Sequence, residues 1–281
     1  MISRPGWLVL CALLSPSAHA QWLNYPSPGT PRTRDGKPNL TAPAPRANGK
    51  PDLSGVWRVQ PDSPAELRRI FGGFLDAVDA LTVPGMTLDL VNRYFINVLA
   101  DFKPQEAPMR QEAVALMRER ASVGGPMKVC LPAGPVVPYI PDPHKIVQTP
   151  SQIVIMYEAD NSHRQIYTDG RVLPKEIIQP SWQGYSAGKW ERDTLVVESA
   201  GFNDKTRLDL LGHPHGEALH VTERFHRRDF GHMDTAITFD DPQFYTKPFT
   251  IQYSEVLLPD TDVFEFVCNE NEKDVVHSQQ K

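Results

Sequence analysis

Cysteine is scarce in this chain, with three residues among 281. Cys11 lies in an N-terminal apolar segment, so a processed chain would keep Cys130 and Cys268. This scarcity excludes zinc sites built from paired cysteines. In an oxidising compartment the simplest state of the two remaining cysteines is a disulfide that closes a loop of about 140 residues. The alternatives are two buried thiols or a catalytic thiol.

Positive charge is also in short supply, because 29 Lys and Arg residues face 34 Asp and Glu residues. The net charge is −5, and it becomes −6 without residues 1–20, which contain one basic residue and no acidic one. Nucleic acids and anionic lipids require a basic surface. We therefore expect no nucleic-acid partner.

Several catalytic motifs are missing as well. No serine lies in a strand-turn-helix nucleophile motif, and no glycine-rich loop opens a helix after a strand. These absences argue against serine hydrolases and nucleotide-binding enzymes. No segment after the N-terminus is long and apolar enough to predict a transmembrane span.

The first 20 residues have the features of a secretory signal peptide. Arg4 supplies positive charge, residues 7–14 form an apolar run that is too short to span a membrane as a helix, and Ala18 and Ala20 form a small-x-small cleavage site. We predict cleavage before Gln21 and a periplasmic or secreted protein. The alternative is an uncleaved N-terminal anchor.

The rest of the chain divides into two parts. Residues 21–50 are rich in proline without apolar periodicity and predict an extended arm or linker. Residues 51–281 predict a single β-barrel domain with a helical insertion at 63–122. From residue 145 onward, short apolar strands recur about every ten residues with hairpin-length connections, which is typical of an antiparallel sandwich or up-and-down barrel. The predicted strands cover 52–59, 145–149, 153–158, 164–168, 186–190, 194–199, 218–227, 233–239, 250–257 and 263–268.

Three helices are predicted in the insertion. Ser63 to Glu66 form a capping box with proline at the first helical position, and Gly72-Gly73 should kink or break the helix that follows. The other two helices are predicted at 87–102 and 108–121. The apolar residues within 64–102 predict a lid packed on the barrel. A homo-oligomer interface or a membrane contact is the alternative.

Gly55-Val56-Trp57 on the first strand resembles the signature of lipocalin-like barrels, in which the Trp closes the barrel floor. A longer pattern resembles a family of uncharacterised secreted bacterial proteins that is common in acidobacteria and some proteobacteria. The resemblance implies a lipocalin-like barrel and carries no activity. It rests on residues 53–57, 130–135, 145–150, 164–171, 184–186, 190–198, 201–204, 212–215 and 219–225.

The hairpin at 191–193 departs from this family pattern, because Arg192 stands where glycine is usual. If this position needs a positive φ, the substitution costs about 1 kcal/mol.

Histidines cluster in one polar segment. His213, His215 and His220 follow Asp204 and Asp209, and His-x-His with a third His or Asp is a pattern that binds zinc or another divalent metal. The alternatives are acid/base catalysis, with Asp204 orienting His213, His215 or His220, and a structural role. The sequence requires no cofactor, and a divalent metal remains an alternative.

The predicted ligand-binding residues are Arg224, Glu223, Tyr185, Trp182 and Arg171. Glu223 and Arg224 are adjacent on a strand, so one of them must face the barrel interior and find a partner there. An inward arginine would hold a ligand carboxylate, and the aromatics would rim an apolar pocket.

Together these residues predict an exported barrel that binds a small, largely apolar or aromatic ligand. The ligand would be transformed by His/Asp acid/base chemistry of the isomerase, lyase, cyclase or hydrolase type. The alternatives are a non-catalytic binding protein and a metal-dependent enzyme or metal carrier.

Overall fold

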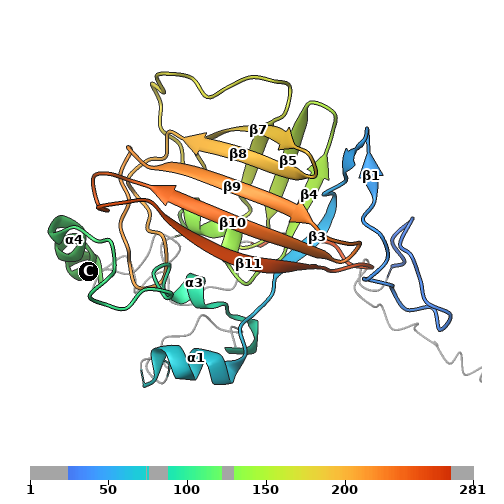
Figure 1. Cartoon of the computed structure of the whole chain (residues 1–281), viewed down its shortest axis with the longest axis horizontal. Helices are drawn as coiled ribbons and strands as arrows, with labels where there is room; N and C mark the ends of the chain where they lie inside the picture. Colours follow the sequence, from blue (N-terminus) through green and yellow to red (C-terminus); the bar gives the residue numbers. More distant parts are fainter. Residues whose placement is uncertain (1–24, 74, 76–87, 122–129, 267–281) are drawn as a thin grey trace, which may run out of the picture.

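Nine strands close into one barrel in the computed structural model, which describes residues 25–73, 75, 88–121 and 130–266 (Figure 1). Around the barrel the order is β10-β11-β3-β4-β5-β6-β7-β8-β9. The predicted mainly-β barrel with a helical insertion is therefore confirmed. The strands are β3 Gly55–Val59, β4 His144–Gln148, β5 Gln152–Tyr157, β6 His163–Tyr167, β7 Tyr185–Glu191, β8 Thr194–Ala200, β9 His220–Arg227, β10 His232–Asp240 and β11 Phe249–Leu257.

Alternation of buried and accessible side chains explains why these segments are strands. In β10, Met233, Thr235, Ile237 and Phe239 are buried, and the residues between them are not. A period of two places one set inside the barrel and the other outside. The same alternation in β5 and β9 fills the interior with side chains from all sides of the barrel.

One neighbouring pair departs from the predicted antiparallel order. β6 and β7 are parallel, with Ile166 opposite Ser186 and Tyr167 opposite Ala187. A parallel pair needs a crossing connection, and residues 168–184 provide it. All the other neighbours in the barrel are antiparallel.

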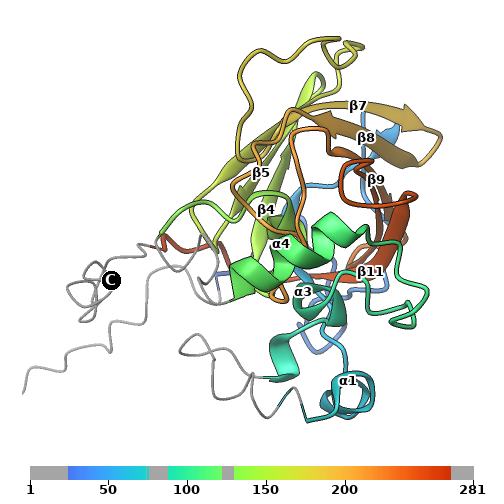
Figure 2. The ribbon, with the colours of Figure 1, turned by 90° about the vertical axis from the view of Figure 1, so that its left-hand side faces the viewer.

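Strand directions place the long connections at one end of the barrel, here called the covered end. The segments 60–143, 201–219 and 241–248 all join strands at this end. Figure 2 looks toward it and shows α4 (Gln111–Ala121) lying across it. The opposite end has short hairpins at 149–151, 192–193 and 228–231.

The insertion begins as the sequence predicts. In α1 (Pro64–Phe71), the Ser63 hydroxyl accepts a hydrogen bond from the Glu66 backbone N–H at 3.2 Å. The helix ends at Gly72, whose φ is +53°. Serine caps and glycine ends are the usual boundaries of a helix.

The predicted helix at 87–102 is wrong. The described residues form only η1 (Leu88–Leu90) and α3 (Arg93–Ile96). Asn92 caps α3 by accepting from the N–H groups of Tyr94 and Phe95, and Asn97 leaves helical geometry with a φ of −145°. Beyond it, the Val98 N–H is bonded to the Asp209 carboxylate at 2.7 Å. A tertiary partner therefore replaces the next helical turn.

The apolar residues of the insertion pack into the core of this chain. Leu67, Phe95, Ile96 and Leu99 are all at most 3% exposed and belong to the same cluster as the barrel interior. A short helix that the sequence analysis missed, η3 (Gly134–Tyr139), lies against α3. This packing agrees with a lid, and a homo-oligomer interface through 64–102 stays a prediction.

The described part of the arm packs against the end opposite the covered end. It includes β1 (Arg46–Ala47) and β2 (Lys50–Pro51), which pair with each other. The Phe230 and Gly231 N–H groups donate to the Ala42 and Leu40 carbonyls, both at 2.7 Å. The arm therefore lies on the β9–β10 hairpin and is not a free linker over its described length.

Trp57 sits inside the barrel near this same end. It is fully buried, its Nε1 donates to the Leu53 carbonyl at 2.9 Å, and the Arg227 guanidinium lies 4.8 Å from the centre of its ring. Gly55 has a φ of +141°, and a Cβ there would lie 2.5 Å from the Leu257 side chain. The positive φ favours glycine at this position, and the terminal methyl group of Leu257 would have to move to admit a Cβ.

Two predictions fall partly outside the described residues. The strand predicted at 263–268 is absent over 263–266, and Cys268 lies outside the described residues. The predicted signal peptide, residues 1–20, also lies outside them. In the part of the chain that the structure describes, no helix is long and apolar enough to cross a lipid bilayer.

Candidate functional site at the covered end

His213 is held by a carboxylate in the loop between β8 and β9. Its Nδ1 lies 2.5 Å from Asp209 Oδ2, and both side chains are at most 5% exposed. Within the described residues, no hydrogen bond reaches His213 Nε2. The predicted orienting residue, Asp204, is instead exposed, and its carboxylate does not contact His213. The Asp209 carboxylate takes that position.

Asp209 also has a structural role. Its oxygens accept from the N–H groups of Val98, Gly212 and His213 at 2.7, 2.9 and 3.1 Å. These donors satisfy the hydrogen-bonding capacity of a carboxylate that is only 2% exposed. Asp209 therefore joins the β8–β9 loop to the insertion and orients one imidazole.

His215 lies two residues further along the same loop and is 1% exposed. Its Nε2 lies 2.5 Å from the Thr206 hydroxyl, and its Nδ1 lies 3.4 Å from the Gly216 carbonyl. Burial lowers the pKa of His215 to about 4. The imidazole is therefore neutral at neutral pH, with Nδ1 as donor and Nε2 as acceptor from Thr206.

Gly134 makes room for this arrangement. Its φ is +74°, and a Cβ there would lie 2.5 Å from the Thr206 hydroxyl oxygen. Glycine at this position therefore lets Thr206, the hydrogen-bond partner of His215, lie close to the start of η3.

His215 lines a cleft of about 350 Å³ between α4 and two loops of the covered end. Leu116 and Phe244 provide apolar walls, and Arg120, Asp204 and Gln243 provide polar ones. The Arg120 guanidinium spans the rim and donates to the Thr206 and Asp204 carbonyls at 3.3 and 3.4 Å. The remaining lining residues are Gly216 and Glu217. The cleft can accept a small molecule with apolar and hydrogen-bonding parts.

The third predicted histidine does not share this site. His220 begins β9 on the side of the strand that faces away from the interior. Among the described residues, no group of three or more His, Cys, Asp or Glu side chains is placed to hold a metal ion. The metal set predicted from His213, His215 and His220 is thus not assembled.

Glu223 and Arg224 face opposite sides of β9, as predicted, and Glu223 is the one inside. Its carboxylate forms a bidentate ion pair with Arg164 of β6, one contact of which is 2.9 Å. Arg164 also donates to the Ser186 and Ser199 hydroxyls at 2.9 and 2.7 Å. Burial alone would lower the pKa of Arg164, but the Glu223 carboxylate overcomes this effect and raises it. Arg164 therefore stays charged beside the Glu223 carboxylate.

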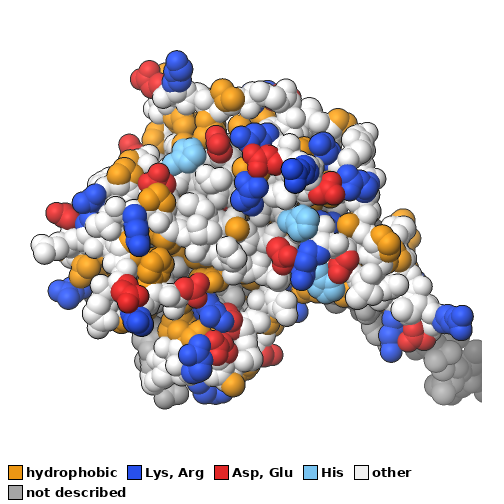
Figure 3. Space-filling view, in the orientation of Figure 1, with side chains coloured by type: hydrophobic (Ala, Val, Ile, Leu, Met, Phe, Trp, Pro, Cys, Tyr) orange, Lys and Arg blue, Asp and Glu red, His pale blue; other side chains and the backbone are white. Residues whose placement is uncertain are grey.

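Arg224 points outward, so it cannot anchor a ligand in the barrel. Its guanidinium lies 3.0 Å from Glu191, and both side chains are about half exposed. On the face seen in Figure 3, acidic and basic side chains are interspersed in this way. Surface ion pairs of this kind contribute little to stability.

A second polar group inside the barrel was missed by the sequence analysis. Glu255 of β11 accepts from the Thr235 hydroxyl at 2.5 Å. Its other oxygen lies 3.1 Å from His144 Nε2, out of hydrogen-bond alignment and without another described partner. His144 precedes the strand predicted at 145–149 by one residue, which is why its inward position was overlooked.

The other predicted ligand-binding residues lie apart from the cleft. Arg171 is exposed, pairs with Asp169 at 2.7 Å and covers the Tyr167 ring. Tyr185 is 41% exposed and donates to the Gln179 carbonyl. The Lys205 ammonium lies 6.0 Å from the Trp182 ring. These residues therefore lie on the outer surface around the crossing loop 168–184.

Alternation along β9 could have placed Glu223. Val221, Glu223, Phe225 and Arg227 share one face, and the first and third of them are apolar. Arg164 similarly shares a face with Ile166. The pairing of these two strands across the barrel interior is a long-range relationship that no local pattern contains.

Comparisons with known proteins gave no match, whether with protein-family models, curated proteins or solved structures.

Proposed function

We propose that this protein binds a small molecule with a largely apolar or aromatic body in the cleft beside His215. The observation that carries this proposal is a buried, neutral imidazole that lines a cleft of about 350 Å³ with both apolar and polar walls. Ligand sites in proteins combine apolar lining with a few fixed polar groups in this way.

The chemistry of the walls supports this ligand class. Leu116 and Phe244 would contact the apolar body, while the Gln243 amide and the Arg120 guanidinium would meet polar substituents. A general base works best with a pKa near the working pH, and the pKa of His215 is about 4. The proposed role of His215 is therefore to bind and orient, which favours a binding protein over an enzyme.

The barrel interior is a less suitable place for the ligand. Large side chains such as Trp57 and Phe239 are fully buried there. The Arg164–Glu223 ion pair occupies the middle of the interior, and a buried pair of this kind is costly to disturb. These contents support a site at the covered end.

Acid/base turnover is the second candidate function, and one observation favours it. The Asp209–His213 pair has the geometry in which a carboxylate orients an imidazole, and no described hydrogen bond reaches the other imidazole nitrogen. Under this hypothesis, His213→Gln abolishes turnover of a bound ligand without abolishing binding. A binding protein would show no turnover in either form.

Ligand-observed NMR of the mature chain tests the binding proposal, with indole and 4-hydroxybenzoate as probes. We expect saturable binding of at least one probe. His215→Gln and Phe244→Ala should each weaken it about tenfold, because each removes one wall of the cleft. Native mass spectrometry of freshly purified protein would identify a co-purified ligand.

His220→Gln is the matched control, because it removes a histidine from the outer side of β9. It should leave probe affinity within about twofold. The proposal would be contradicted if His215→Gln and His220→Gln weakened probe binding equally. It would also be contradicted if neither probe bound and no ligand co-purified.

Export is proposed as well. The N-terminal pattern supports cleavage before Gln21 and a periplasmic or secreted location, and membership in the secreted bacterial family stays a prediction. Intact mass and N-terminal sequencing of protein from its native host would test cleavage. A mature chain that still begins at Met1 would contradict it.

A further inference from the structure

A second cleft lies on the outer wall of the barrel, between β11 and the α3 segment. Its volume is about 600 Å³, within the range of sites that bind small ligands. Six residues determine its chemistry, namely Gln60, Asp62, Arg93, Tyr94, Asp101 and Gln252. It has no lining residue in common with the His215 cleft.

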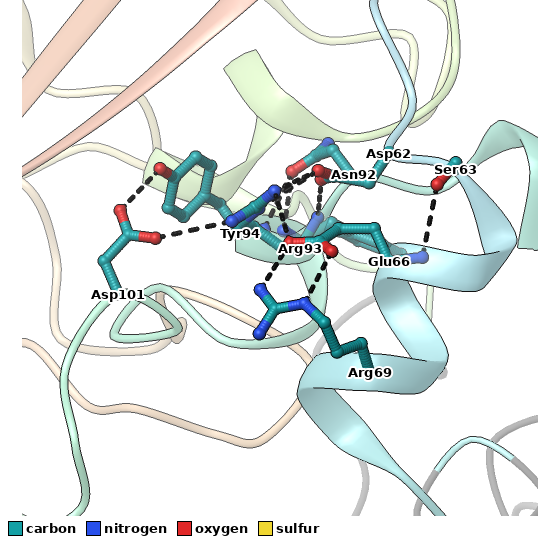
Figure 4. Close-up of polar contacts among 9 residues, drawn as sticks. Asp62, Ser63, Glu66, Arg69, Asn92, Arg93, Tyr94 and Asp101 are labelled. Carbon is teal, nitrogen blue, oxygen red and sulfur yellow. Dashed lines mark hydrogen bonds and ion pairs between the residues drawn. The ribbon is translucent and has the colours of Figure 1, made fainter.

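The positive charge in this cleft is already neutralised. Figure 4 shows Arg93 surrounded by carboxylates of the insertion. Arg93 Nε lies 3.1 Å from Asp62 Oδ1, and the guanidinium lies 3.5 Å from Glu66 and 3.7 Å from Asp101. The Arg93 backbone N–H also donates to Asp62 at 2.8 Å. An anionic ligand would find the Arg93 cation already paired, and it would meet the carboxylates of Asp62 and Asp101, which line the cleft.

The polar groups of this cleft that have no described hydrogen-bond partner can bind the hydroxyl groups of a ligand. The side-chain amides of Gln60 and Gln252 are exposed and have no described hydrogen-bond partner. Each amide offers both a donor and an acceptor, as hydroxyl groups do.

Asp101 and Tyr94 complete this set. The Asp101 carboxylate is 49% exposed and accepts from the Tyr94 hydroxyl at 2.7 Å. Burial raises the pKa of Tyr94, so its hydroxyl stays protonated. The cleft thus presents a carboxylate acceptor beside two amides, without a free cation. Such a set can bind vicinal hydroxyl groups in pairs.

We propose that this cleft binds an uncharged, hydroxyl-rich small molecule of the saccharide or polyol class. The ligand would approach the outer wall of β11 and meet Gln60, Gln252 and Asp101, which all line the cleft. The site is independent of the proposed His215 cleft, and either proposal can fail without the other.

Isothermal titration of the full mature chain with glucose, galactose, maltose and cellobiose tests this site. We expect at least one of these to bind with a dissociation constant of about 1 mM or tighter. Gln252→Ala and Asp101→Asn should each weaken binding about five- to tenfold, the effect of losing one or two hydrogen bonds. Asp101→Asn keeps the size of the side chain and removes its charge.

Gln165→Ala is the matched control, because it removes an exposed glutamine from β6, far along the barrel from this cleft. It should not change saccharide affinity. Circular dichroism and urea midpoints would establish that each variant folds. The proposal is overturned if no saccharide binds, if putrescine or inorganic phosphate binds in their place, or if the cleft variants bind as well as the control.

Discussion

Arg164 of β6 and Glu223 of β9 form a bidentate ion pair inside the barrel, with side chains 5% and 1% exposed. Replacing Arg164 by Met would leave the Glu223 carboxylate buried without a cation. We expect Arg164→Met to lower the free energy of unfolding by roughly 3–5 kcal/mol. Urea unfolding followed by circular dichroism would measure the change.

The double variant Arg164→Met/Glu223→Met separates the burial of a charge from the loss of packing. It should recover much of the loss, because no charge is left unpaired. Arg224→Met, which breaks the exposed pair with Glu191, should cost about 0–1 kcal/mol. A loss for Arg164→Met as small as that of the surface variant would contradict this account.

The low pKa of His215 predicts a dependence of stability on pH. Its pKa is about 4 in the folded protein and 6.5 in an ordinary setting. Between these values the unfolded chain binds the proton more tightly. Stability from this group is therefore complete above about pH 6.5 and is lost as the pH falls toward about 4, by about 3 kcal/mol.

Comparison with His215→Gln isolates this contribution from that of the carboxylates. The difference in unfolding free energy between wild type and variant, measured from pH 7 to pH 4, should shrink as the pH falls. His220→Gln serves as the control and should run parallel to wild type. A difference that stays constant with pH would show that His215 is not buried in its neutral form.

The hairpin between β7 and β8 offers a stabilising substitution. Arg192 has a φ of +58°, a conformation that L-residues adopt at a cost of roughly 1 kcal/mol. Arg192→Gly should raise the free energy of unfolding by about 0.5–1 kcal/mol, after the entropy of glycine in the unfolded chain is counted. Thermal unfolding would detect the gain.

Arg34→Gly is the control for this substitution, since Arg34 is exposed and its φ is not positive. It should give no gain. Equal shifts in both variants would mean that relief of the Arg192 backbone is not the cause.

The disulfide between Cys130 and Cys268 stays a prediction, and two hydrogen bonds of neighbouring described residues support it. The Ala133 N–H is bonded to Asp160 at 2.8 Å, and the Phe266 N–H is bonded to Asn161 at 3.0 Å. Two segments that lead to the cysteines thus lie on the same β5–β6 turn. Non-reducing peptide mapping should recover one peptide pair that joins Cys130 to Cys268.

Removal of this disulfide should destabilise the folded protein. Cys268→Ser is expected to lower the free energy of unfolding by roughly 4–5 kcal/mol, because the link closes a long loop. Alkylation of both thiols in the unfolded, unreduced protein would rule out the disulfide.

The strands could be predicted because their pattern is local. Apolar residues at every second position, bounded by turns such as Pro150-Ser151, locate β4 and β5 to within one or two residues. The family pattern raised a positive φ at Arg192 only as a condition, and the structure meets it with a φ of +58°, since a two-residue hairpin determines its own geometry. Which strand lies beside which is not local, and the parallel β6–β7 pair was not predicted.

The candidate site also combines features that a local sequence pattern can indicate with contacts that it cannot. The segment rich in histidine brings His213 and His215 to the covered end but leaves His220 on the outer side of β9. The sequence pattern was interpreted with Asp204 as the residue that orients a histidine, whereas Asp209 holds His213 in the structure. Asp209 is held in this position by the Gly212 N–H of its own loop and by the Val98 N–H, which lies 111 residues away in the sequence. The amides of the second cleft come from segments nearly 200 residues apart, so no local pattern could join them.

The odd number of strands has a consequence for how the barrel opens. A closed barrel in which all neighbouring strands are antiparallel must have an even number of strands. A barrel of nine strands therefore contains a parallel pair. This parallel pair is β6–β7, with only two residue pairs in register. Arg164 crosses it from the inside through Ser186 and continues to Glu223 on β9. The ion pair therefore stabilises the barrel beside the strand pair with the fewest residues in register. Backbone amide hydrogen exchange should begin at β6 and β7 once the ion pair is removed.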